Sequence, residues 1–225
     1  MASSPITSSL EALPSYEDHG SRRPRGNQEI FRLRWSLSSE SISSAIEVLD
    51  DATDPNSPHK PFQDPETLQY HPIASLSLTD PPVSSVSVEI YDFVQWPGEW
   101  QSHVDHLDDP DLEARHEEVD PRPPEHVPLV VRSPSPSRPL TVLDYVGAVH
   151  PWAYRHKADV VRARMVWKTG ETMPPDVGVY LSPSMTAHII HAQVPESTNP
   201  ATWPAFWERI RGSVARRAKR LSTRP

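Results

Sequence analysis

The sequence contains no cysteine among its 225 residues, and it contains only 7 glycines. The absence of cysteine excludes disulfides, a thiolate nucleophile and a cysteine-ligated zinc site. The patterns G-x-x-x-x-G-K-[ST], G-x-G-x-x-G and G-x-S-x-G are absent too. These absences argue against a phosphate-binding glycine loop and against the nucleophile elbow of serine hydrolases.

Long hydrophobic runs are also missing. No window approaches the roughly 18 apolar residues that a membrane-spanning helix needs. The first 20 residues have neither the basic region nor the apolar stretch of a secretory signal peptide. We therefore expect a protein without a transmembrane segment that resides in the cytoplasm or the nucleus.

Proline, in contrast, is abundant. The chain has 27 prolines, and only 36% of its residues are hydrophobic. Proline fixes φ and removes a backbone donor, so this content argues against a helical bundle and against a central parallel sheet. We predict an α+β fold with a small, mostly antiparallel sheet of about four to six short strands and two or three helices on one face.

Composition changes along the chain and divides it into three parts. Residues 1–27 are rich in Ser and Pro and are predicted to be a disordered N-terminal flank. Residues 28–198 are predicted to form a single α+β domain with an acidic loop insertion at 97–128. Residues 199–225 are predicted to form a basic amphipathic C-terminal helix and tail.

Alternation of apolar and polar residues predicts the strands. Phe31, Leu33 and Trp35 alternate with arginines and indicate a half-buried strand near the start of the domain. The same criterion predicts two strands within 71–94, broken at Asp80-Pro81-Pro82, and further strands at 129–131, 177–181 and 187–194.

Helical spacing predicts the remaining elements. Thr141 is a predicted N-cap with Asp144 three residues later, and it precedes an apolar stripe. That stripe consists of Val142, Tyr145, Val146 and Val149. Further helices are predicted at 42–49, 151–166 and 199–220. We expect the helices at 141–166 and 199–220 to pack on the same face of the sheet.

Three segments are similar to a known family. They are IFRLRWSL near the start, the paired region IASLSLTDPPVSSVSVEIYD, and PLTVLDYVGAVHPW. Together they resemble an uncharacterised domain family of mushroom-forming (basidiomycete) fungi. The resemblance covers roughly residues 28–195 and implies a small α+β domain of no established activity. It transfers no catalytic residue to this chain.

The net charge of −8 is unevenly distributed. Residues 99–127 carry 10 acidic and 2 basic side chains, whereas residues 204–225 carry 1 acidic and 7 basic ones. Nucleic acid or an anionic membrane is therefore a possible partner only through the basic tail. The alternative is a docked terminal helix with a solvated basic end.

Tryptophans and basic residues are the candidate interaction residues. Aromatic and arginine side chains often anchor interfaces, although they are equally common as ordinary core or surface residues. The candidates are Trp96, Trp100, Trp203, Trp207, Arg216, Arg217, Lys219 and Arg220. Our leading hypothesis is a non-enzymatic, intracellular protein-interaction or scaffold module with an unidentified protein partner and no cofactor.

Eleven histidines provide the basis for an alternative hypothesis. His103, His106 and His116 are weak candidates for a metal site, and the histidine-rich loop could form a lid over the pocket of an enzyme. His150 and His156 lie near Asp144 and Asp159 in sequence and could form an acid–base pair. Capping by Asp144 and ion pairing of Asp159 with a neighbouring arginine explain both carboxylates equally well.

Overall fold

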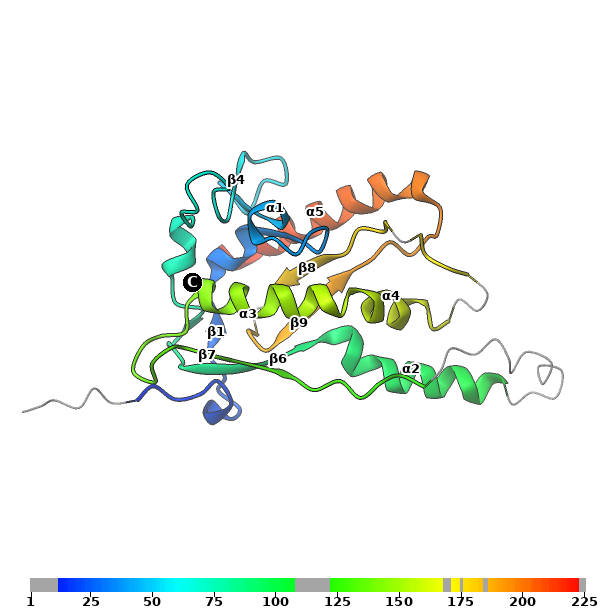
Figure 1. Cartoon of the computed structure of the whole chain (residues 1–225), viewed down its shortest axis with the longest axis horizontal. Helices are drawn as coiled ribbons and strands as arrows, with labels where there is room; N and C mark the ends of the chain where they lie inside the picture. Colours follow the sequence, from blue (N-terminus) through cyan, green and yellow to red (C-terminus); the bar gives the residue numbers. More distant parts are fainter. Residues whose placement is uncertain (1–11, 108–121, 168–170, 175, 184–185, 223–225) are drawn as a thin grey trace, which may run out of the picture.

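A seven-stranded mixed sheet is the centre of the computed structural model, which describes residues 12–107, 122–167, 171–174, 176–183 and 186–222 (Figure 1). Its strands are β2 (Leu33–Ser36), β3 (Ile46–Leu49), β4 (His59–Pro61), β6 (Ser85–Ile90), β7 (Leu129–Arg132), β8 (Tyr180–Pro183) and β9 (Ile189–Gln193). Their order is β4-β3-β2-β8-β9-β6-β7. Neighbouring strands are antiparallel except β6 and β9, which are parallel.

The prediction of an α+β fold is confirmed, but the sheet is larger than predicted and is mixed. A separate two-stranded ribbon pairs β1 (Arg25–Gly26) with β5 (Thr79–Asp80). The helices are α1 (Ile42–Ala45), α2 (Tyr91–Leu107), α3 (Val142–Arg155), α4 (Lys157–Met165) and α5 (Trp203–Ser222). Short 3-10 turns occur at η1 (Glu17–His19), η2 (Gln28–Arg32), η3 (Pro72–Ser75) and η5 (Pro200–Thr202).

Side chains alternate across the sheet, and its two faces meet different helices. Trp35 on β2 is paired with Leu181 on β8, and its indole N–H donates to His150 on α3. Tyr180 precedes Leu181 and points the other way, where its ring centroid lies 4.5 Å from that of Trp207 on α5. The expectation that these helices share a face is therefore wrong. An amphipathic stripe identifies the apolar side of a helix but not the sheet face that it covers.

Helix α3 begins as the sequence predicts. The Thr141 hydroxyl accepts a hydrogen bond from the backbone N–H of Asp144, and the Asp144 carboxylate accepts one from the backbone N–H of Thr141. The predicted apolar stripe, from Val142 to Val149, is buried against the sheet. Helix α2 packs beside α4 and against β6 and β9, so α2, α3 and α4 form one layer.

Part of the N-terminal flank is ordered, contrary to the prediction for residues 1–27. Residues 1–11 lie outside the described residues, but the chain from residue 12 onward packs on the domain. Tyr16 is fully buried, and its backbone N–H donates to the oxygen of Ser85 on β6 at 2.9 Å. The buried ring of Tyr16 and hydrogen bonds to the backbone and side chains around β6 hold this segment, and average composition cannot reveal these contacts.

The predicted loop insertion at 97–128 begins inside a helix. Helix α2 continues through Pro97 to Leu107, although Pro97 cannot donate to the carbonyl oxygen of Phe93. Phe93, Trp96 and His103 are buried at helical spacing, and this packing compensates for the lost hydrogen bond. Residues 122–128 are extended, and residues 108–121 lie outside the described residues.

Two other elements also differ from the predictions. The helix predicted at 42–49 is one turn, α1, followed by strand β3, because Ile46 and Val48 are buried on the same face of the sheet. The first strand predicted within 71–94 is the 3-10 turn η3, which Pro72 begins. Short apolar runs do not distinguish a strand from a helical turn.

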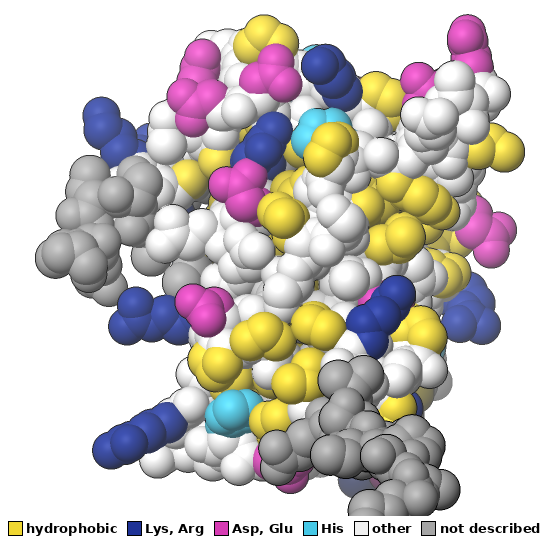
Figure 2. Space-filling view, turned by 90° about the vertical axis from the view of Figure 1, so that its left-hand side faces the viewer, with side chains coloured by type: hydrophobic (Ala, Val, Ile, Leu, Met, Phe, Trp, Pro, Cys, Tyr) yellow, Lys and Arg dark blue, Asp and Glu magenta, His cyan; other side chains and the backbone are white. Residues whose placement is uncertain are grey.

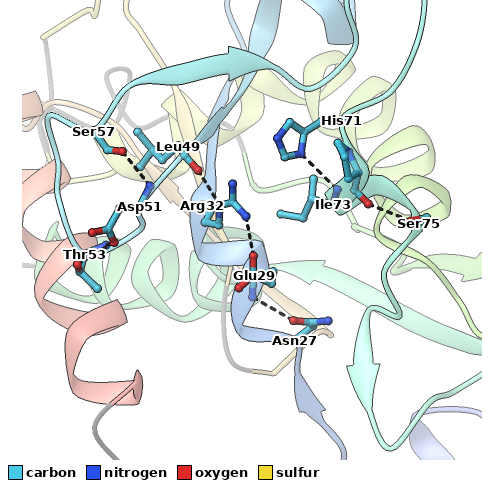
Figure 3. A network of polar contacts seen from close by, with 11 residues as sticks. Asn27, Glu29, Arg32, Leu49, Asp51, Thr53, Ser57, His71, Ile73 and Ser75 are labelled. Carbon is cyan, nitrogen blue, oxygen red and sulfur yellow. Dashed lines mark hydrogen bonds and ion pairs between the residues drawn. The ribbon is translucent and has the colours of Figure 1, made fainter.

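Turn η2 is held in place by a polar network (Figure 3). Asn27 caps it by accepting a hydrogen bond from the N–H of Glu29. Arg32 donates to the Glu29 carboxylate at 2.7 Å and to the backbone oxygen of Leu49 on β3 at 2.6 Å. The network fixes η2, which contains the buried Phe31, against the sheet.

Candidate functional site

A cavity of about 290 Å³ lies between α5 and the sheet. It lies on the face of the sheet opposite to α3, where α5 crosses β2, β3 and β8. Its described lining includes Phe31, Arg34, Ser36, Glu47, Tyr180, Ser182, Gln193, Trp207, Ile210, Arg211 and Val214. This size is at the lower end of the range for small-molecule sites.

Aromatic rings form one wall of the cavity. The ring of Trp207 lies against Tyr180. Phe206, which is outside the lining, meets the Trp207 ring edge-on with centroids 4.6 Å apart. Gly178 makes room for the indole, because a Cβ at that position would lie 3.3 Å from Cζ2 of Trp207. The wall provides a flat apolar surface against which the body of a ligand can pack.

Charged side chains lie at the polar side of the cavity. Arg34 donates from Nη2 to the backbone oxygen of Pro55, while its Nε–H is buried and has no hydrogen-bond partner. Glu47 is paired with His59, at 3.2 Å between Oε1 and Nε2. Arg211 is exposed at the rim. Arg34 lines the cavity, and a buried donor without an acceptor is costly, so its guanidinium is the group to which a ligand oxygen would bind.

The four candidate tryptophans lie on two different helices. Trp96 is 1% exposed, and Trp100 packs partly buried against the core, both on α2. On α5, Trp203 donates its indole N–H to the backbone oxygen of Ser197 at 2.9 Å. Of the four, Trp207 lines the cavity beneath α5. They do not form one continuous surface.

The four candidate basic residues lie along the second half of α5. Arg216, Lys219 and Arg220 are exposed, whereas Arg217 is half-buried with its guanidinium 5.4 Å from the Phe31 ring centroid. On the face drawn in Figure 2, basic side chains of the described residues stand among acidic and apolar ones. That face carries no continuous basic surface of the kind that nucleic acid requires.

The histidines of the predicted metal site pack against a tryptophan. His103 and His106 on α2 meet the Trp167 ring edge-on, at centroid distances of 5.2 and 5.6 Å. His106 also contacts the backbone oxygen of Ser102 through Nδ1 at 2.6 Å. His116 lies outside the described residues. Both described histidines therefore have a packing role that needs no ion.

Other histidines do converge. His126, His156 and Asp159 each offer one possible metal-ligating atom, and these atoms lie within 4.8 Å of one another. The sequence places His156 close to Asp159, but His126 is 30 positions earlier in the chain than His156. Only its position in space connects it to the other two, so sequence spacing carries no signal for this cluster.

His150 has a structural role. Its Nδ1 accepts from the Trp35 indole at 2.9 Å, so Nε2 carries the proton and donates to the backbone oxygen of Ser39 at 3.0 Å. Burial lowers the pKa of His150 below its usual range, which keeps the ring neutral. Asp144 completes the capping box of α3 with the N-cap Thr141, and it also binds Arg138. No acid–base pair forms between these two residues.

A buried carboxylate joins α2 to α4 and β9. Asp92 is 6% exposed and pairs with Nε of Arg164, and it accepts from the backbone N–H of Ala192 at 3.3 Å. Burial raises the pKa of Asp92, and the charge of Arg164 opposes this shift. Because both partners contact the backbone of β9, the pair positions the helices on the sheet.

Comparisons with protein-family models, curated proteins and solved structures gave no match to this chain. The resemblance to the fungal family therefore stays a prediction from the sequence. Within the described residues, no helix is both long enough and apolar enough to cross a membrane.

Proposed function

We propose that this protein is a non-enzymatic binding module whose ligand site is the cavity beneath α5. The ligand is a carboxylate-bearing group with an apolar body, presented by a partner protein or by a small molecule. Its carboxylate meets Arg34, and its apolar body packs against Trp207 and Tyr180.

The position of Arg34 in the cavity lining, with one guanidinium N–H that has no acceptor, is the observation that carries this proposal. Arginine keeps its charge at any physiological pH and binds carboxylates through paired N–H donors. The nearby Glu47 carboxylate contacts Nε2 of His59, and Arg34 donates instead to the backbone oxygen of Pro55. A ligand carboxylate would therefore give Arg34 the acceptor that it lacks, in a cavity partly shielded from water.

The lining of the cavity favours binding over catalysis. The described lining contains serines such as Ser36 and Ser182 but no histidine that could act as a general base, and His191, which lies opposite Ser182 where β8 pairs with β9, lines an adjoining hollow instead. The cluster of His126, His156 and Asp159 contributes no residue to the described lining. The enzyme hypothesis, with a lid formed by 97–128, loses support because α2 occupies the first part of that segment.

Binding to a membrane or nucleic acid has less support than the cavity. The apolar stripe of α5 is turned toward the sheet, as the half-buried Trp207, Ile210 and Val214 indicate. An anionic bilayer would have to compete for that stripe, because interfacial helices bury their apolar face in the membrane. The outer basic side chains would give only salt-dependent attraction.

The test compares carboxylates with their uncharged amides. Calorimetry measures the binding of two sets of ligands to the full-length protein. One set is aromatic and branched aliphatic acids, and the other is short peptides with an apolar C-terminal residue. We expect the acids to bind, and Arg34→Gln to weaken them by roughly 10-fold or more, because a hydrogen bond to a charged group contributes about 1.5–3 kcal/mol. The amides should bind both proteins equally.

Arg216→Gln is the matched control, since it removes an exposed arginine from the outer side of α5. Tight binding of peptides alone would identify a protein partner, and tight binding of acids alone a small molecule. Equal affinity of the acids for the wild type and Arg34→Gln would refute the proposal. So would a failure of every acid and peptide to bind.

A further inference from the structure

The cluster of His126, His156 and Asp159 brings two parts of the chain together. His156 is the residue between α3 and α4, and Asp159 lies in the first turn of α4. His126 comes from the extended segment 122–128. All three side chains are half-buried.

The spacing of the possible ligand atoms suits a small ion. Nδ1 of His156 lies 3.4 Å from Oδ2 of Asp159. Ligands about 2.0–2.1 Å from a tetrahedral ion are separated by about 3.3 Å, so this pair already has the required separation. The three possible ligand atoms lie within 4.8 Å of one another. The His126 ring therefore needs to move by only about an ångström or two to bring its nitrogen to the separation that the ion requires.

The His126 ring is held in place and yet lacks a hydrogen-bond partner. It is stacked on Phe93, with centroids 3.7 Å apart, and lies 5.9 Å from Trp96. Its Nε2 is buried and has no hydrogen-bond partner. Buried polar atoms are normally satisfied, so such an atom in a cluster of potential ligands suggests a missing partner.

Asp159 is oriented from its other side. Its second oxygen, Oδ1, lies 3.6 Å from Nη1 of Arg162. That guanidinium lies 5.3 Å from the centroid of Trp96. The arrangement leaves Oδ2 turned toward His156, and it resembles the outer contacts that orient ligands in metal sites.

We propose that His126, His156 and Asp159 form a binding site for one divalent transition-metal ion. Two imidazoles and one carboxylate suit Zn²⁺ in a four-coordinate site and Fe²⁺ in a six-coordinate site. Three protein ligands leave coordination positions open to water. This inference is independent of the cavity beneath α5, which contains none of the three residues.

The experiment measures binding of Zn²⁺ to the chelator-treated full-length protein by calorimetry. We expect one ion per chain. Asp159→Asn, which preserves the shape of the side chain, and His126→Gln should each weaken binding by roughly 100-fold or more, since changes outside the ligands alone cost about 10–100-fold. His106→Gln, an exposed histidine on α2, should bind as the wild type does.

Co²⁺ then identifies the geometry. Intense visible absorption bands would indicate a four-coordinate, zinc-like site, and weak bands a six-coordinate, iron-like one. Near-ultraviolet circular dichroism checks that the variants are folded, and loss of the Co²⁺ spectrum in a folded Asp159→Asn protein supports the site. The absence of Zn²⁺ binding to the wild type would overturn it, as would unchanged binding in both folded variants.

Discussion

The two faces of the sheet are built differently. On the face covered by α3, Trp35 and His150 are almost completely buried and bonded to each other. On the face covered by α5, the apolar stripe of the helix is only half-buried, and a cavity separates part of it from the strands. The first face resembles a protein core, and the second resembles an interface between two partners.

This difference shows how one sheet can combine stability with binding. A densely packed region such as that around Trp35 and His150, whose polar groups are bonded to each other, loses stability when a buried side chain is truncated. A loosely covered face with a buried, unsatisfied arginine can accept a ligand without being rebuilt. We therefore expect substitutions on the α3 face to change stability most, and substitutions on the α5 face to change ligand affinity.

Removal of the Trp35 side chain should have the largest effect on the stability of the protein. Trp35→Ala leaves a large cavity and removes the donor to His150, so we expect a loss of about 3–5 kcal/mol in the free energy of unfolding. The measurement is urea denaturation followed by circular dichroism. Trp207→Ala on the opposite face is the paired control, and an equal or greater loss there would contradict the comparison.

Acid should have the second-largest effect, because it should lower the free energy of unfolding through His150 on the α3 face. The folded-state pKa of His150 lies below its unfolded value of about 6.5, so the unfolded chain binds a proton more readily. Stability should therefore be constant above about pH 6.5 and fall as the pH drops below it, by at most about 1.4 kcal/mol per pH unit from this group.

Urea midpoints between pH 8 and pH 5 measure this dependence. Burial also lowers the pKa values of His71, His188 and His191, and these groups add to the slope in the same direction. His150→Gln should make the slope shallower, although the variant is less stable at every pH. An unchanged slope in this variant would show that His150 does not take part.

Substitution of two glycines should have the smallest effects, a gain in stability on the α3 face and a loss of ligand affinity on the α5 face. A Cβ at Gly147 in α3 would meet nothing within 4 Å, so Gly147→Ala should stabilise the protein by about 0.5–1 kcal/mol through helix propensity. Gly178→Ala crowds Trp207 and should instead displace α5 slightly, which reduces acid binding in the cavity. Thermal unfolding and calorimetry measure the two effects, and destabilisation by Gly147→Ala would contradict the first.

Local sequence signals predicted several elements well. The Thr141 cap and the stripe that follows it define α3, because both depend on residues within one or two turns of each other. The strand around Trp35 and the amphipathic helix after Asn199 were predicted for the same reason. Signals of this kind need no knowledge of distant contacts.

The rest depends on contacts between distant segments. Helix α2 continues through Pro97 because Phe93 and Trp96 find partners on other elements, which proline content alone would not suggest. The cavity forms where α5 meets the opposite face of strands from both ends of the chain. Of its key residues, Trp207 was predicted as an interaction residue, whereas Arg34 was not, since an arginine in a strand is ordinarily exposed.

The strand order has a consequence for how the molecule assembles. β8 and β9 are the last strands in the chain, yet they lie at the centre of the sheet, between β2 on one side and β6 on the other. Until this hairpin forms, the β2–β3–β4 ribbon and the β6–β7 pair share no strand pairing in the described sheet. During synthesis, the edges of β2 and β6 would stay unpaired until residues 180–193 have been made. Such late, long-range strand pairing makes folding slow.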